Sequence, residues 1–208
     1  INAARLGIEA TIVMPEYTPI VKVTRTTGYG GNVILHGGAY DEAAAYARRL
    51  CVEQGRTFVH AFDDHAIIAG QGTAALELLD DLDDLHAVII PVGGGGLLTG
   101  MAVVIKAIRP DIEVIGVQTS AFPSMVRALA AGKRVELPAE RTIADGIAVG
   151  KTGEKTFELA KQHVDRVIEV SEEAITTAIV DLLEQERVVS EGAAAAALAA
   201  VTSGELDH

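Results

Sequence analysis

The sequence predicts an α/β fold with doubly wound, mainly parallel sheets. Short runs of β-branched residues recur along the 208-residue chain, and segments with helical spacing separate them. The best defined run, Val88–Ile90, is apolar at consecutive positions, which is typical of a strand covered by helices on both faces. Apolar residues make up 49% of the chain, enough to build a core around such a sheet.

Six strands are expected from these β-branched runs. They are Ala10–Met14, Val33–Leu35, Thr57–His60, Ala87–Val92, Glu113–Val117 and Arg166–Val170. Helices are expected between them at about 41–55, 67–82 and 171–183, where apolar residues recur every three or four positions. Ser171 is a typical N-cap for the third helix, and Ala193–Ala197 belongs to a last, alanine-rich helix.

Charge and cysteine content exclude several classes of protein. The net charge of −12 would repel the phosphates of a nucleic acid. Cys51 is the single cysteine, so no internal disulfide forms, and no Cys/His cluster is present to hold zinc. No apolar run reaches the ~20 residues that a bilayer requires. We therefore expect a cytoplasmic protein that binds small molecules, without a nucleic-acid or membrane partner.

The chain is expected to be a fragment of a protein with two lobes. Its first residues, up to Gly7, have the pattern of a helix already under way, and its last helix is followed by no closing strand. The spacing of the elements changes near Phe62. We therefore expect residues 1–62 in a smaller lobe and residues 63–208 in a larger, cofactor-binding lobe that is incomplete at its C-terminal end.

The strongest local signal is the run Gly93–Gly96, between a buried strand and a helix. Four residues without Cβ allow successive backbone N–H groups to converge at the positive end of the helix, which is typical of a phosphate site. A tight turn is the alternative, but it requires only one or two glycines. Leu98 stands where a dinucleotide fingerprint needs its third glycine, and Met101 stands where a nucleotide-triphosphate loop needs lysine. A monophosphate on a small molecule is the remaining expectation.

Five motifs, in this order, resemble the threonine dehydratase branch of the fold type II pyridoxal-phosphate enzymes, whose fold is similar to that of tryptophan synthase β. They are Ala10–Pro15, Ile67–Thr73, Pro91–Leu97, Thr142–Gly146 and Val189–Ala193. The resemblance spans essentially the whole chain and extends to serine dehydratase, serine racemase and hydroxyaspartate dehydratase. It implies pyridoxal 5′-phosphate as cofactor, an amino acid as substrate and a homo-oligomer.

The resemblance also implies roles for particular residues. The phosphate group of the cofactor would be bound by the amides of Gly93, Gly94, Gly95, Gly96 and Leu97. Phe62 would lie beside the cofactor ring, Glu191 near its pocket, and Asp145 and Gly146 would face the substrate. Plainer interpretations stay open: core packing for Phe62, a solvated helix residue for Glu191 and an Asp-Gly turn for Asp145.

The chain departs from the family pattern in three respects. The lysine that forms the Schiff base would lie upstream of Ile1, and none of the six lysines here has the expected Ser-aromatic context; they are Lys22, Lys106, Lys133, Lys151, Lys155 and Lys161. A Ser-Gly-Asn loop and a late Ser-Gly-Gly segment are also missing, so no catalytic residue is expected within this chain. The metal site of racemase-like members would fall at Gln118, Phe122 and Ser124, which offer no carboxylate, so no metal is expected.

The activity implied by the resemblance is the dehydration and deamination of L-threonine, and of L-serine, to 2-oxobutanoate or pyruvate with release of ammonia. It belongs to amino-acid metabolism, with isoleucine biosynthesis as one setting. Two alternatives stay open: a serine racemase-like enzyme, and a non-catalytic module that binds a phosphorylated small molecule through Gly93–Leu97. Gln118 and Ser124 favour the dehydratase over the racemase.

Overall fold

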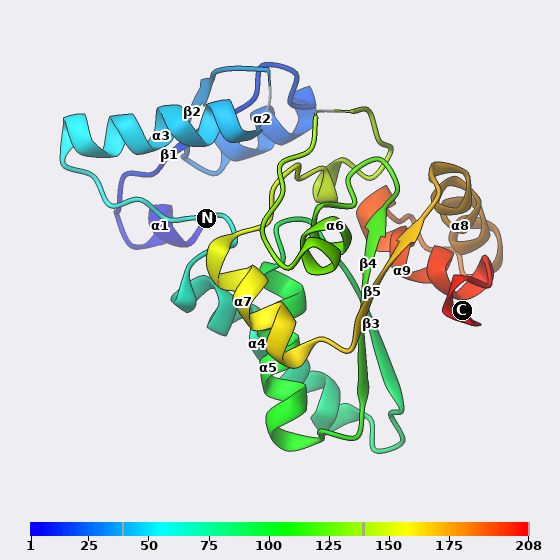
Figure 1. The fold of residues 1–208 in the computed structure, drawn as a ribbon. Coiled ribbons are helices and arrows are strands. Elements are labelled where there is room, and N and C mark those ends of the chain that lie inside the picture. Colours follow the sequence, from blue (N-terminus) through cyan, green and yellow to red (C-terminus); the bar gives the residue numbers. More distant parts are fainter. Residues whose placement is uncertain (39, 139, 208) are drawn as a thin grey trace. The chain divides into compact units, whose positions relative to one another are not determined.

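The computed structural model describes residues 1–38, 40–138 and 140–207, apart from the side chains of residues 41 and 207. The chain divides into two compact units, Ile1–Val59 and His60–His208. Each unit has its own sheet, and all strand pairs within the two sheets are parallel. Helices connect the strands in both units (Figure 1). These features confirm the predicted α/β class with parallel sheets.

In its described residues, the first unit has a small two-stranded sheet and three helices. Its elements are α1 (Asn2–Arg5), β1 (Thr11–Met14), α2 (Ile20–Gly28), β2 (Asn32–Leu35) and α3 (Tyr40–Gln54). The strands pair in register from Thr11 opposite Asn32 to Met14 opposite Leu35. Helix α3 packs on β1 and carries the buried side chain of Ala43.

The strand predicted at Thr57–His60 is wrong. No strand pairs with these residues in the part of the chain that the structure describes, and Val59 is 71% exposed. A β-branched composition favours a strand only where another strand offers hydrogen bonds and packing. The chain turns instead, because the ring nitrogen Nδ1 of His60 accepts the backbone amides of Phe62 (3.1 Å) and Asp63 (2.8 Å).

The second unit has a three-stranded sheet between two layers of helices. Its strands lie in the order β3 (Ala87–Pro91), β4 (Glu113–Thr119) and β5 (Arg166–Val170). One face is covered by α4 (His65–Asp81), α5 (Gly96–Ile108), α6 (Ser124–Ala131) and α7 (Glu154–His163), and the other by α8 (Glu172–Gln185) and α9 (Gly192–Thr202). Figure 1 shows the sheet edge-on between these layers. Ser171 caps α8 as predicted, since its hydroxyl accepts the amide of Ala174.

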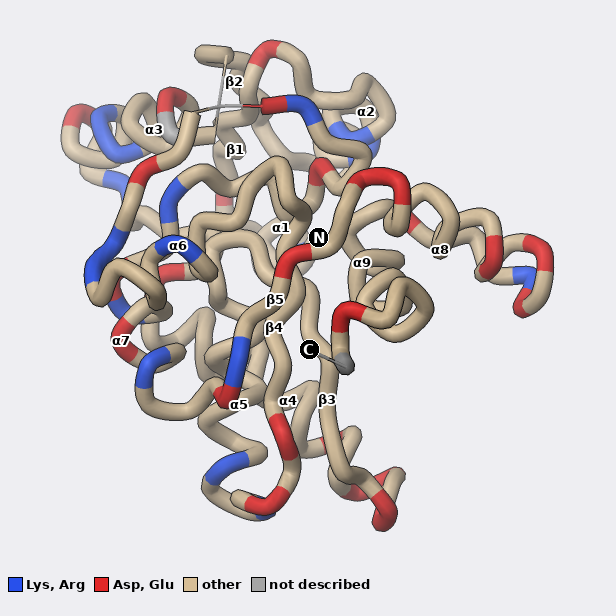
Figure 2. Tube along the Cα trace, turned by 45° about the vertical axis from the view of Figure 1, so that its right-hand side comes forward, with Lys and Arg blue, Asp and Glu red and all other residues tan. Residues whose placement is uncertain are grey.

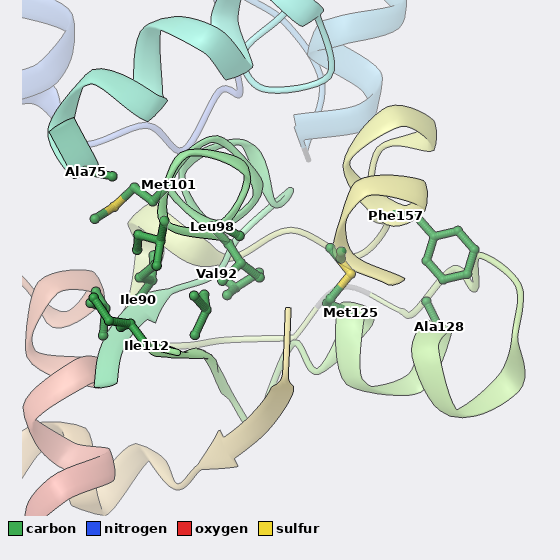
Figure 3. Close-up of a cluster of buried hydrophobic side chains, with 14 residues drawn as sticks. Ala75, Ile90, Val92, Leu98, Met101, Ile112, Met125, Ala128 and Phe157 are labelled. Atoms are coloured by element: carbon green, nitrogen blue, oxygen red, sulfur yellow. The ribbon is translucent and has the colours of Figure 1, made fainter. Parts of the chain in front are cut away.

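Two apolar cores flank this sheet, which explains the consecutive apolar residues in its strands. Ile90 and Val92 belong to the core cluster on the side of α4, α5, α6 and α7, which also includes Leu98 and Met125 (Figure 3). Ile89, one position along, packs into the other core with α9. Because alternate residues of a strand point to opposite faces, burial of both faces favours apolar residues at consecutive positions.

Helices α4 and α5 approach each other through facing glycines. A Cβ on Gly100 would lie 2.3 Å from the backbone oxygen of Ile68, and a Cβ on Gly72 would lie 2.8 Å from the backbone oxygen of Gly100. Both residues are buried. The contact between the two backbones therefore depends on the absence of a side chain at Gly72 and at Gly100. Of the helices that the structure describes, none has the length and apolar content needed to cross a bilayer.

Four acidic residues, Asp80, Asp81, Asp83 and Asp84, lie exposed at the end of α4 and in the loop before β3, and Figure 2 marks the acidic residues along the chain. The carboxylate of Asp165 differs from these exposed groups. Oδ2 of Asp165 lies 2.6 Å from Nζ of Lys106 and accepts the amide of Val114 at 2.7 Å. Partial burial acts to raise the pKa of Asp165, but the hydrogen bonds from Lys106 and Val114 outweigh it, so the pKa lies below its ordinary value.

This lowered pKa predicts acid sensitivity. The unfolded chain binds more protons than the folded protein in this range, so the stabilisation is present above the unfolded pKa of about 3.9 and is lost as the pH falls through the native pKa of Asp165. We expect Asp165→Asn to lower the free energy of unfolding at pH 7, and the difference from wild type to shrink towards pH 3. Urea denaturation at a series of pH values measures this, with Asp80→Asn at the exposed end of α4 as control. An Asp165→Asn deficit that stays constant with pH would contradict the assignment.

Candidate functional site

The four glycines form a loop between β3 and the first turn of α5, which we call the glycine loop (Gly93–Gly96). Gly95 is the N-cap of α5 and has a left-handed φ of +99°. Among the described residues, no protein group accepts a hydrogen bond from the backbone N–H of Gly93 through Leu97. A row of amide donors at the positive end of a 13-residue helix is typical of an anion site. The loop thus has the geometry that a bound phosphate needs.

The surroundings of the loop explain why four glycines are required. A Cβ on Gly93 would lie 3.2 Å from Cα of Ile147, and one on Gly94 would lie 2.4 Å from the Phe62 ring. A Cβ on Gly95 would lie 2.8 Å from Cε of Met125. A tight turn alone would not place a neighbour against each successive glycine. The close packing therefore favours a built cradle over a simple turn.

A buried hydroxyl and a distant carboxylate brace the loop. Thr156, which is fully buried, donates its hydroxyl to the backbone oxygen of Gly94 at 2.7 Å. Asp63 accepts the amides of Glu154 (2.9 Å), Lys155 (2.8 Å) and Thr156 (3.2 Å), and so caps α7 from 91 or more residues away in sequence. The carboxylate fixes the start of α7, and α7 fixes the hydroxyl that holds Gly94.

The other predicted site residues lie beside the loop at the carboxyl ends of the strands. Asp145 and Gly146 are exposed in a short 3-10 helix, Asp145–Ile147, whose last residue contacts Gly93. A Cβ on Gly146 would lie 3.3 Å from a carboxylate oxygen of Glu191, which is exposed just before α9. The ring of Phe62 packs on Gly94. The structure therefore brings the predicted cofactor and substrate residues together within the second unit.

Gln118 occupies the position considered for a metal. Its side chain is fully buried, and Oε1 accepts the amides of Met125 (2.7 Å) and Val126 (3.1 Å) at the start of α6. Nε2 donates to the backbone oxygen of Val92 (3.2 Å) and to the hydroxyl of Ser124 (3.3 Å). Within the described ranges, no group of three or more His, Cys, Asp or Glu side chains could hold a metal ion.

Several lysines have structural partners away from the glycine loop. Lys106 donates to the backbone oxygen of Ile112 and pairs with Asp165, at the amino ends of β4 and β5 and thus at the opposite edge of the sheet. Lys151 pairs with Glu136 at 2.7 Å, and Lys161 pairs with the neighbouring Glu158. Asp63 and Thr156 were not predicted from the sequence, because neither lies in a motif and both act across the fold.

Comparisons with known proteins agree with this geometry. Residues 2–208 match the sequence model of the family described as "Pyridoxal-phosphate dependent enzyme". An L-threonine ammonia-lyase of Thermotoga maritima is 51% identical over 195 residues, which are 94% of this chain and 49% of the relative. The processed form of threonine deaminase isoform 2 from Solanum lycopersicum superposes with a TM-score of 0.88 at 40% identity, covering 94% of this chain and 54% of that one. For maize serine racemase the TM-score is 0.93 at 34% identity, covering 99% and 62%.

The chain spans about half the length of the Thermotoga relative. The relatives confirm the resemblance to threonine dehydratases that the five motifs indicated, and the superpositions confirm the predicted fold. The match over residues 2–208 confirms the predicted cofactor class. The chain therefore belongs to the pyridoxal-phosphate dependent enzyme family.

Proposed function

We propose that the complete protein is a pyridoxal-phosphate dependent L-threonine ammonia-lyase, which converts L-threonine to 2-oxobutanoate and ammonia and L-serine to pyruvate and ammonia. The observation that carries this proposal is the row of amide donors from Gly93 to Leu97 at the start of α5. The 51% identity to an L-threonine ammonia-lyase supports the choice of reaction. In this proposal the second unit is the cofactor-binding lobe.

The residues present fit the phosphate of this cofactor. The glycine loop offers consecutive N–H donors, and the α5 dipole favours a negative charge at the same point. A carboxylate close to the loop would oppose a bound phosphate. The carboxylate of Asp63 accepts three amides of α7 and is therefore directed to that helix and not to the phosphate. When bound, pyridoxal phosphate draws electron density from the α-carbon of an amino acid, which is the chemistry that the reaction requires.

The chain's own residues would hold and orient the reactants. The amides of Gly93–Leu97 bind the phosphate, and the ring of Phe62, which packs on Gly94, forms a wall beside it. Asp145 and Gly146 contact the amino acid from the neighbouring loop, with the carboxylate of Glu191 adjacent to Gly146. Because Ile147 contacts Gly93, a shift of either loop would displace the other. In this proposal the arrangement would position the substrate against the cofactor, and positioning is a main source of the acceleration that binding residues supply.

The test of this proposal uses the complete gene product with added pyridoxal phosphate. We expect a visible absorption band that borohydride removes while modifying a lysine in a Ser-aromatic-Lys segment. L-threonine should then yield 2-oxobutanoate and ammonia in equal amounts. A colourless protein would contradict the cofactor assignment. Formation of D-serine without 2-oxo acid would identify a racemase, and binding of the phosphate group without turnover would identify a non-catalytic module.

Thr156 offers a graded test of the glycine loop. Thr156→Val keeps the shape of the side chain but removes the hydroxyl that donates to Gly94, and a net hydrogen bond contributes about 1 kcal/mol. We expect the affinity for pyridoxal phosphate to fall about fivefold in Thr156→Val and to stay within twofold in Thr156→Ser, which retains the hydroxyl. Fluorescence titration of the cofactor measures both. Equal affinity in the two variants would show that this hydroxyl does not hold the loop.

The cellular setting is part of the same proposal. We expect a cytoplasmic homo-oligomer whose partner is its amino-acid substrate, without a nucleic-acid or membrane partner. Its single cysteine and its net charge of −12 support this setting. We expect the 2-oxobutanoate to be used in amino-acid metabolism, and isoleucine biosynthesis is the predicted pathway.

A further inference from the structure

Glu172 joins three segments of the second unit through its carboxylate. Oε1 accepts the hydroxyl of Thr119, at the end of β4, and the hydroxyl of Thr142 at 2.7 Å. Oε2 accepts the backbone amide of Ile143 at 2.8 Å. Glu172 itself is the first residue of α8 and follows β5. One side chain therefore connects the ends of two strands to the segment that leads into Asp145.

The surroundings of this carboxylate favour its ionised form. Partial burial acts to raise the pKa of Glu172, but hydrogen bonds from Thr119, Ile143 and Thr142 outweigh it, so the pKa lies below its ordinary value. The positive end of α8 also favours a negative charge at this position. All three groups bound to the carboxylate act as donors, and an ionised carboxylate offers only acceptors. The charge of Glu172 and the geometry of its partners are thus matched.

The tethered segment leads directly into the predicted substrate loop. The hydroxyl of Thr142, which Glu172 holds, also accepts the amide of Ala144 at 3.0 Å, and Ala144 is fully buried. Asp145 and Gly146 follow at once. On the far side of the segment, a Cβ on Gly192 would lie 2.5 Å from the backbone oxygen of Ile143, so α9 abuts it. The backbone before Asp145 is therefore fixed by Glu172 on one side and by α9 on the other.

We infer that Glu172 is a positioning residue for substrate binding: its carboxylate holds Thr142–Ala144 so that Asp145 and Gly146 face the amino acid. This inference rests on the proposed function and adds a residue that contacts neither cofactor nor substrate. In the described part of the chain, the glycine loop donates no hydrogen bond to the Glu172 carboxylate, whose donors are Thr119, Thr142 and Ile143. Loss of the carboxylate is therefore expected to weaken substrate binding and to leave cofactor binding intact.

The experiment compares Glu172→Gln with Glu173→Gln in the complete holoenzyme. Glu173 is the next residue of the same helix turn and is exposed, so its substitution makes the same change of charge at the same helix end. We expect Glu172→Gln to raise KM for L-threonine about tenfold with kcat within threefold, the pattern of a lost contribution to substrate binding. The cofactor absorption spectrum should be unchanged. Glu173→Gln should leave KM and kcat within twofold of wild type.

Hydrogen–deuterium exchange gives a readout that needs no turnover. The amide of Ile143 and its neighbours should exchange at least tenfold faster in Glu172→Gln than in wild type, and at the wild-type rate in Glu173→Gln. Unchanged exchange, or a loss of kcat at constant KM, would overturn the inference. If the wild-type protein forms no 2-oxobutanoate, the proposed function fails, while faster exchange in Glu172→Gln would still support the tether itself.

A second pair of variants decides the matter if Glu172→Gln does not fold. Thr142→Val removes the hydroxyl that Glu172 accepts, and Thr142→Ser retains it. We expect a higher KM, about threefold or more, and faster exchange near Ile143 in Thr142→Val, with both restored in Thr142→Ser. Equal behaviour of the two Thr142 variants would overturn the inference, and so would a higher KM in Thr142→Ser alone, because Ser lacks only the methyl group and keeps the hydroxyl that donates to Glu172.

Discussion

Gly95→Ala is expected to abolish retention of pyridoxal phosphate by the complete protein. Gly95 has a φ of +99°, which L side chains rarely adopt, so a Cβ adds backbone strain of about 1–2 kcal/mol. The same Cβ would lie 2.8 Å from Cε of Met125 and 2.9 Å from Cβ of Thr156, both fully buried. The loop must move to relieve the backbone strain and these close contacts, and its amides would then no longer converge. We expect the cofactor affinity to fall at least ~100-fold, about 3 kcal/mol.

The measurement is the ratio of bound cofactor to protein after gel filtration, together with a titration of the affinity. Gly132→Ala is a matched control, because Gly132 also has a positive φ, +66°, but has nothing within 4 Å of its Cβ position. It should lose some stability and keep a full complement of cofactor. Stoichiometric cofactor in Gly95→Ala would show that the loop does not bind the phosphate through this backbone geometry.

Gly100→Ala is expected to produce the largest loss of stability in the second unit. In most helix interiors a change from glycine to alanine stabilises by about 0.5–1 kcal/mol, since alanine loses less entropy on folding. Here the added methyl would lie 2.3 Å from the backbone oxygen of Ile68 and 2.9 Å from the amide nitrogen of Gly72. Backbone atoms cannot rotate away as a side chain can, so α4 and α5 must separate. We expect a loss of about 3 kcal/mol, at the upper end for overpacked cores.

Gly70→Ala is the control for this prediction. Gly70 lies in α4, two residues from the crossing, and has nothing within 4 Å of its Cβ position. It should raise the free energy of unfolding by about 0.5–1 kcal/mol. Urea denaturation of both variants, followed by circular dichroism, measures the two effects. If Gly100→Ala also stabilises the protein, the two helices do not meet at the distance described.

The sheet of the second unit could be predicted from the sequence because its evidence is local. Strands β3, β4 and β5 coincide with apolar runs such as Val88–Ile90, and burial on both faces requires such runs. The glycine loop is equally visible, since four consecutive glycines are costly without a function. Thr57–His60 is a wrong prediction because its composition suits a strand, whereas a strand also requires a neighbour to pair with.

The residues that hold the site could not be predicted because they act between distant segments. Asp63 binds amides of α7 that lie 91 to 93 residues away, and Glu172 binds Thr119 across 53 residues. In the sequence, an acidic residue at the start of a helix has the same local pattern whether its carboxylate binds that helix or a distant segment. Thr156 has no sequence signal at all, since its hydroxyl matters only because α7 lies beside the glycine loop. These roles depend on the packed fold.

The side-chain amide of Gln118, which donates two hydrogen bonds and accepts two, should be insensitive to changes of solution conditions. It connects Val92, just before the glycine loop, to the first residues of α6 through a group that carries no charge and releases no proton in water. Acid, added salt and chelating buffers therefore leave this junction unaltered, whereas the Glu172 and Asp165 junctions weaken as acidity increases. Because the pKa of Glu172 lies below its ordinary value, the segment around Asp145 should loosen only in strong acid, and it should do so before the base of the phosphate cradle does.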